Sequence, residues 1–214
     1  ESGTVAKVFA ELDSWKQQFE EVSEKAQTLT ESCASFDMPQ PRFDGLESLE
    51  ADITKTADNW EMLKEYTNEV DVMAEMSWLD FRGNVFALQD LATAWAEKVK
   101  EKILAGEHSL VTDFLSEQLD QIKHAMPALK FCRGEPFGED HWAELLQGKL
   151  GLPRDVKLVG LQVKHFLQSL TVLMDPGTVT FVKQLQARAQ GEVTIREALS
   201  ELKAWSQTTE IKLL

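Results

Sequence analysis

The sequence predicts an all-α protein, in which an elongated bundle of long antiparallel helices is followed by a compact bundle of shorter helices. Over most of the first 125 residues, apolar side chains recur at alternating spacings of three and four, the seam pattern of packed helices. Proline and glycine pairs interrupt these runs, and after Leu129 the interruptions come closer together. We therefore expect a long-helix bundle over residues 1–125 and a short-helix module over residues 126–214.

The first apolar run predicts one long helix over residues 5–36. Its members keep the alternation without a slip: Val5, Val8, Leu12, Trp15, Phe19, Val22, Ala26, Leu29, Cys33 and Phe36. A helix of this length is about 50 Å long at a rise of ~1.5 Å per residue. Pro39 and Pro41 end it, because proline lacks the backbone donor and forces the preceding residue out of the helical region.

Three further runs predict long helices. The run over residues 46–73 is expected to pair with the first helix as an antiparallel hairpin. The run over residues 78–103 keeps its period, and the sequence leaves open whether it bends or breaks at Arg82-Gly83, before a stop at Ala105-Gly106. A fourth helix covers residues 110–125, after which Pro127 permits either a kink or an end.

The last part predicts shorter helices. Asp140 is expected to cap a helix that carries Trp142 and stops between Gly148 and Gly151. A helix over residues 158–174 and another over residues 179–189 are expected to follow.

A capping box predicts where the final helix begins. Thr194 and Glu197 have the Thr-x-x-Glu spacing in which each side chain satisfies a free backbone amide of the other residue. The helix that starts there carries Leu199, Leu202 and Trp205. Residues 210–214 are compatible with either the start of a strand or a frayed end.

The net charge of −14 is concentrated at the start of the chain. Residues 1–80 hold 19 Asp and Glu against 6 Lys and Arg, whereas residues 126–214 hold 10 against 11. An acidic surface repels phosphate, so we expect no nucleic-acid binding. Gln162, Lys164 and His165 break the most apolar stretch, so we expect no membrane insertion. The start at Glu1, without Met or a signal sequence, suggests a fragment or a processed product.

Motifs for chemistry are missing from the sequence. Gly148-Lys149 is followed by Leu150 and preceded by Ala143 where a phosphate-binding loop needs glycine. The four histidines are scattered and lie outside any zinc motif: His108, His124, His141 and His165. Glu139, Asp140 and Asp155 are explained by capping and solvation better than by acid–base catalysis. We predict no catalytic, cofactor-binding or metal site, and we expect Cys33 and Cys132 to be reduced and packed.

Six tryptophans stand against one tyrosine. Trp15, Trp60 and Trp95 lie on seam positions, which favours a role as core fillers between helices. The alternative is an aromatic surface that anchors a partner, since tryptophan is enriched at interfaces. We also expect Trp142 and Trp205 to pack the short helices.

Two blocks of the last part resemble the dynein heavy chains. They are residues 126–146, which include "RGEPFGEDHW", and "ARAQGEVTIREALSELKAW" at residues 187–205. "GLPR" at residues 151–154 points the same way, and "ADNWEMLKEY" and "SWLDFR" match more loosely. The resemblance is to the place where the tail joins the linker, and it is stronger to the cytoplasmic dynein 2 class than to cytoplasmic dynein 1 or axonemal forms.

This resemblance implies a non-catalytic mechanical segment of a minus-end-directed microtubule motor. It would couple the cargo-bound tail to the linker in retrograde intraflagellar transport, with ATP and Mg confined to the AAA+ ring of the parent chain. The partners it implies are the rest of the heavy chain in a homodimer, the light intermediate and intermediate chains, and intraflagellar transport train proteins. The implied location is the cilium or flagellum and the cytoplasm, with the cytoskeleton. The alternatives are a stand-alone helical adaptor or the same segment of another dynein class.

Overall fold

The computed structural model describes residues 2–208, and these form helices and turns without a β-strand. The all-α prediction is confirmed. The chain divides into two compact units: unit 1 is Glu1–Asn68 with Glu107–Asp113, and unit 2 is Glu69–Gly106 with Phe114–Leu214. Residue 125 lies inside helix α5 (Leu110–Phe131), and the division of the chain at that residue stays a prediction.

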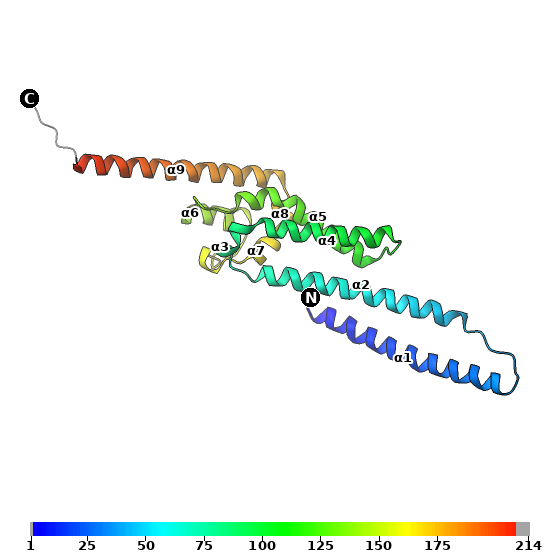
Figure 1. Cartoon of the computed structure of the whole chain (residues 1–214). Coiled ribbons are helices and arrows are strands. Elements are labelled where there is room, and N and C mark those ends of the chain that lie inside the picture. The colour runs from blue at the N-terminus through cyan, green and yellow to red at the C-terminus, as the bar shows by residue number, and fades with distance from the viewer. Residues whose placement is uncertain (1, 209–214) are drawn as a thin grey trace, which may run out of the picture. The chain divides into compact units, whose positions relative to one another are not determined.

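Unit 1 is built around a helical hairpin. Helix α1 (Ser2–Ser35) and the first part of helix α2 (Asp44–Ala74) run antiparallel and are joined by the turn that carries the two prolines (Figure 1). Asp37 in this turn adopts a left-handed φ of 51°, which ends the helix. Leu12 of the predicted α1 seam is buried, whereas the buried side chains on the α2 part of the hairpin are Asn59, Met62 and Tyr66, which lie outside the seam predicted for residues 46–73.

The third predicted run breaks at the position that the sequence left open. Helix α3 (Trp78–Phe81) passes into a 3₁₀ turn, η1 (Arg82–Asn84), before helix α4 (Phe86–Leu104) begins. Helix α4 ends as predicted, since Gly106 has a φ of 83°, a conformation that glycine adopts without strain. Helix α5 does not end at residue 125 but continues through Pro127 to Phe131.

The predicted cap at Asp140 is wrong. Helix α6 (Glu139–Ala143) already contains Asp140 in its first turn, and it runs on into a π-helical turn, η2 (Glu144–Lys149). The side chain that satisfies a free amide here is His141, whose Nδ1 accepts from the Gly138 N–H at 3.2 Å. The predicted stop is confirmed, because Gly151 has a φ of 69° directly after this turn.

The single helix predicted over residues 158–174 is also wrong. A 3₁₀ turn, η3 (Leu158–Gly160), is followed by helix α7 (Val163–Leu167) and helix α8 (Leu170–Leu173). Leu161 and Gln162, which lie between η3 and α7, have an extended backbone, because this segment pairs with residues 76–78 instead of with the next helical turn. This long-range pairing overrides the local helical pattern.

The last two predicted helices form one helix, α9 (Pro176–Thr208). Thr194 is therefore not a cap, and its hydroxyl donates to the Gln190 carbonyl one turn earlier, at 3.1 Å. The cap is Asp175, whose Oδ2 accepts from the Thr178 N–H at 2.9 Å, with Pro176 at the first helical position. Residues 210–214, where a strand or a frayed end was expected, lie outside the described residues.

The tryptophans divide between core and surface. Trp78, Trp95 and Trp142 are buried in unit 2, as the core interpretation requires. Trp60 is half-buried, and Trp15 is 49% exposed, so the expectation that Trp15 fills the core is wrong. Trp205 is 58% exposed, so the expectation that it packs the short helices is wrong as well. Cys132 is fully buried and Cys33 is half-buried, both as free thiols.

Candidate functional site: the junction of α2 with the short helices

The end of α2 is fastened to the segment before α7 by backbone hydrogen bonds. The Trp78 N–H donates to the Leu161 carbonyl at 2.8 Å, and the Val163 N–H donates to the Met76 carbonyl at 3.1 Å. Between them, Ser77 and Gln162 form an isolated antiparallel β-bridge. We call residues 75–78 with residues 161–164 the junction, because it joins two segments of unit 2 that are far apart in the sequence.

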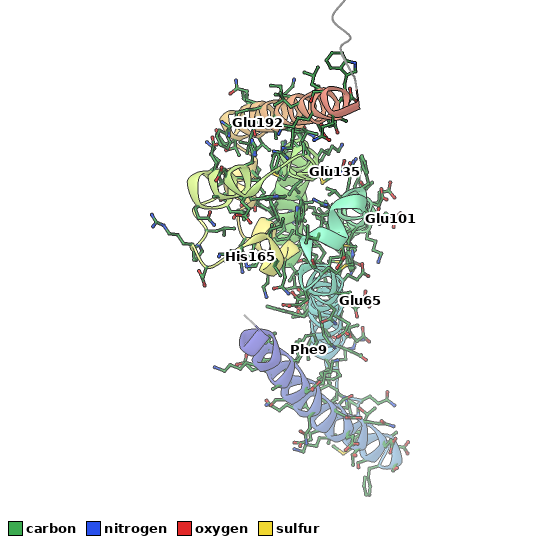
Figure 2. The ribbon with its side chains drawn as sticks, turned by 90° about the vertical axis from the view of Figure 1, so that its left-hand side faces the viewer. Phe9, Glu65, Glu101, Glu135, His165 and Glu192 are labelled. Carbon is green, nitrogen blue, oxygen red and sulfur yellow. The ribbon has the colours of Figure 1, made fainter. Side chains whose placement is uncertain are left out.

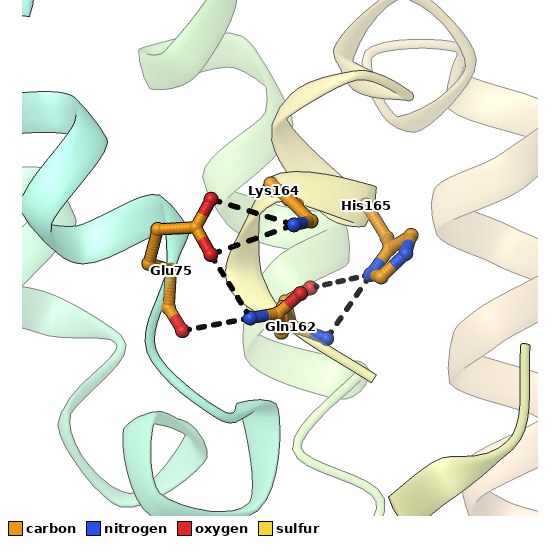
Figure 3. A network of polar contacts seen from close by, with 4 residues as sticks. All are labelled: Glu75, Gln162, Lys164 and His165. Carbon is orange, nitrogen blue, oxygen red and sulfur yellow. Dashed lines mark hydrogen bonds and ion pairs between the residues drawn. The ribbon is translucent and has the colours of Figure 1, made fainter. Parts of the chain in front are cut away.

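Side chains add a polar layer to the junction (Figure 3). The Gln162 amide donates to the Glu75 backbone carbonyl at 3.0 Å and to its Oε2 at 3.2 Å, and Lys164 Nζ lies 3.4 Å from Oε1 of the same carboxylate. His165 Nδ1 accepts from the Gln162 N–H at 3.0 Å, which caps α7. Because the Glu75 side chain is 68% exposed, its ion pair contributes at most about 1 kcal/mol, and the backbone bonds dominate.

Trp78 anchors the junction in the core of unit 2. Its ring stacks on Phe166 of α7 with centroids 3.9 Å apart and planes 30° apart. Its Nε1 donates to the Cys132 carbonyl at the end of α5, at 3.2 Å. The Trp78 side chain therefore contacts both the end of α5 and α7. Cys132 lies in the same core, and its burial raises the pKa of its thiol well above the usual range.

A second set of contacts fastens α9 to the segment of α6 and η2. The Arg188 guanidinium donates to Glu144 across the two elements, and this hydrogen bond raises the pKa of Arg188. Glu192, labelled on α9 in Figure 2, lies one turn further along and places its Oε1 3.4 Å from Nε2 of buried His141. Since His141 Nδ1 accepts from Gly138, neutral His141 carries its proton on Nε2, facing Glu192.

A cavity of about 790 Å³ lies beside α6 and the following loop. It brings Glu139 and Asp140 together with Arg154 and Lys157, whereas Asp155 is not among its lining residues. Over residues 2–208, no group of three or more His, Cys, Asp or Glu is placed to hold a metal ion. Within the same residues, no helix is long and apolar enough to cross a membrane.

A family model matches most of the chain. The model describes the dynein heavy chain, N-terminal region 2, and it matches residues 46–214, which include the whole junction and α9. The chain is a member of the dynein heavy chain family.

Individual dynein heavy chains support the same assignment. The chain is 31% identical over 196 residues to the cytoplasmic dynein 2 heavy chain 1 of Caenorhabditis elegans and 32% identical over 190 residues to that of Homo sapiens, which is 92% and 89% of its length. It is 30% identical to the Chlamydomonas reinhardtii protein over 98% of its length. In each case the chain spans only 4–5% of the relative. No solved structure matches the chain.

The matched region places this dynein segment in the N-terminal tail of a dynein 2-type heavy chain. The blocks that carried the resemblance fall on α6 with η2 and on α9, the elements that Arg188, Glu144 and His141 join. Sequence reasoning missed the junction itself. Gln162 lies within a predicted helix, and no local signal pairs it with Glu75, although Trp78 lies on an apolar seam that predicts burial.

Proposed function

We propose that this segment couples the cargo-bound tail of a dynein 2-type heavy chain to its linker, as a mechanical element without catalysis of its own. The observation that carries the proposal is the junction. There the end of a long helix is held to a short-helix core by two backbone hydrogen bonds and a buried Trp78–Phe166 stack. Such a joint transmits force, because displacing α2 requires these bonds to break together.

The rest of unit 2 supports the same role. Force that enters at the end of α2 reaches Phe166 and Cys132 through Trp78, and it reaches α9 through the contacts of Arg188 and Glu192. Val182, Leu185 and Ala189 bury the first half of α9 in the same core. Helix α9, with 33 residues, is a long and stiff element that would carry this force away from the core.

The motor context is part of the proposal. The parent chain would be a homodimeric, ATP-hydrolysing, minus-end-directed microtubule motor of retrograde intraflagellar transport, in the cilium or flagellum and the cytoplasm. Its tail would hold light intermediate chains, intermediate chains and transport-train proteins. The names of the relatives at 30–32% identity support the dynein 2 class over another dynein class or a stand-alone adaptor.

Flexible insertions in the full-length heavy chain test the coupling. A short Gly-Ser insertion between Met76 and Ser77 interrupts the junction, and the same insertion at Gln40 in the α1–α2 turn is the matched control. We expect the first insertion to leave microtubule-stimulated ATP turnover unchanged and to slow microtubule gliding, with little effect from the control. Equal gliding velocities for the two insertions would contradict the coupling role.

Imaging of transport trains tests the cellular assignment. In ciliated cells whose only copy of this heavy chain carries the junction insertion, we expect slower retrograde trains and an unchanged anterograde velocity. Normal retrograde velocity with altered transport elsewhere in the cytoplasm would argue for another dynein class.

A further inference from the structure

The hairpin of unit 1 covers only one of the two rows of its heptad seam. On α1, Leu12 is buried, and Phe19, Ala26 and Cys33 of the same row are half-buried. The alternate row remains exposed: Trp15 at 49%, Val22 and Leu29 at 50%, and Phe36 at 78%. Trp15, Val22 and Leu29 are seven residues apart in turn, so they form an apolar stripe along one side of α1, and Phe36 follows at the same spacing directly after the helix.

The exposed row borders a groove within unit 1. Val22 and Leu29 line it from α1, Phe43 and Leu49 line it from the α2 side, and its volume is about 470 Å³. Leu49 is itself 47% exposed. We call this the hairpin groove. A third helix laid in it would cover both apolar rims, as in a three-helix bundle in which each helix packs against the other two.

The charge of the hairpin indicates the kind of helix that fits. Residues 1–68 hold 15 Asp and Glu against 6 Lys and Arg. Two copies of so acidic a surface repel each other, whereas a helix with Lys and Arg beside its apolar stripe is attracted. Lys25 is the one charged residue among those that line the groove, and the other lining residues are apolar.

We propose that the hairpin groove is a docking site for an amphipathic helix of another protein, with an apolar heptad row flanked by Lys and Arg. The apolar row of that helix would contact Val22, Leu29 and Leu49, and its basic flanks would face the acidic outer surfaces of the hairpin. This inference rests on the exposed row, the groove and the charge, and it holds whether or not the junction transmits force.

A designed peptide serves as the probe. It has about four heptads, with Leu and Ile in the a and d positions and Lys in the e and g positions. Two control peptides separate the contributions: one carries Glu in place of Lys, and the other keeps the basic composition but scrambles the heptad order. Binding of the labelled peptide to the full-length heavy chain is followed by fluorescence anisotropy.

Polar substitutions in the chain locate the site. Leu29→Gln and, separately, Val22→Gln remove apolar surface from the groove at half-exposed positions and keep helix propensity. Val72→Gln is the matched control, because Val72 lies on α2 at 72% exposure and outside the groove. Far-UV circular dichroism checks that each variant keeps its helices.

The expected result is binding of the basic heptad peptide that is about tenfold or more tighter than that of either control peptide. Leu29→Gln should weaken it about tenfold, Val72→Gln should leave it within about twofold, and added salt should weaken it.

Equal binding of the scrambled peptide, or no effect of Leu29→Gln, would reduce the attraction to non-specific charge and overturn the proposal. Equal binding of the acidic peptide would overturn the basic chemistry of the partner. Absence of peptide binding would overturn the site, and sedimentation that shows a dimer abolished by Leu29→Gln would assign the groove to a second copy instead.

Discussion

Trp78 and Phe166 stack with their ring centroids 3.9 Å apart, although one lies at the start of α3 and the other in α7. The contact closes over the backbone pairing of Met76 and Trp78 with Val163 and Leu161, and both rings are almost completely buried. Because the ring stack and the backbone hydrogen bonds lie at the same place, the residues that follow α2 belong to the core of the short helices.

Trp142 is expected to be a structural residue and Trp205 a dispensable one. Trp142 is 4% exposed and packs edge-on against Phe137 at 5.2 Å, so Trp142→Ala should cost about 3–5 kcal/mol in the free energy of unfolding, as for other large-to-small core changes. Trp205→Ala, at a position more than half exposed, should cost less than about 1 kcal/mol. Urea unfolding followed by circular dichroism measures both. Similar costs for the two variants would contradict this division.

Gly134 is expected to tolerate no side chain. Its φ is +62°, and a Cβ there would lie 2.3 Å from Cζ2 of Trp142. Gly134→Ala should therefore destabilise unit 2 by at least about 2 kcal/mol through backbone strain and displacement of a buried ring. Gly191→Ala is the control, because open space surrounds Gly191 inside α9, and it should stabilise the chain by about 0.5–1 kcal/mol. Thermal unfolding compares the two, and a neutral Gly134→Ala would show that the loop relaxes freely.

The two cysteines are expected to differ in reactivity. Cys132 is fully buried and burial raises the pKa of its thiol, whereas Cys33 is half-buried on α1. At neutral pH, a thiol reagent should label Cys33 in the native chain and Cys132 only after denaturant is added. Mass spectrometry of the labelled peptides identifies each site. Labelling of Cys132 at the rate of Cys33 would mean that the core beneath Trp78 opens readily.

Tyr66 is expected to titrate late. Burial raises its pKa from about 10 to about 12, and it is the one tyrosine of the sequence, so tyrosinate absorbance reports on it alone. Because the unfolded chain loses this proton near pH 10 and the folded chain only near pH 12, the free energy of unfolding falls as the pH rises between these two values. Below pH ~10 the contribution of Tyr66 to stability is fully present, and it is lost as the pH rises through about 12. An absorbance titration with a midpoint near 10 in the folded chain would show that Tyr66 is solvated.

The sequence predicts the long helices better than the short ones. The hairpin of α1 and α2 follows from an unbroken heptad pattern and two prolines, which are local signals. The capping motif at Thr194 misled, because nothing before it breaks the helix and Asp175 with Pro176 already provides a stronger start. The break at Leu161 has no local signal, since the strand-like pairing with residues 76–78 creates it.

The candidate site was predictable only in part. Burial of Trp78 follows from its seam position, but the partners Phe166, Cys132 and Gln162 come from distant segments whose pairing is a property of the tertiary fold. The heptad pattern predicts that Trp15, Val22 and Leu29 are core residues, whereas the structure leaves them exposed. A heptad pattern shows that a helix packs on two sides, and it does not show how many of the partners belong to the same chain.

The force at which a single motor stalls in an optical trap tests the coupling role most directly. The comparison is between the full-length heavy chain with the Gly-Ser insertion at Met76-Ser77 and the same chain with the insertion at Gln40 in the α1–α2 turn. We predict a clearly lower stall force for the junction insertion at an unchanged rate of ATP turnover, with the control close to the native motor. A stall force that the junction insertion leaves unchanged would mean that the load does not pass through the contact of Trp78 with Phe166, and it would contradict the mechanical role.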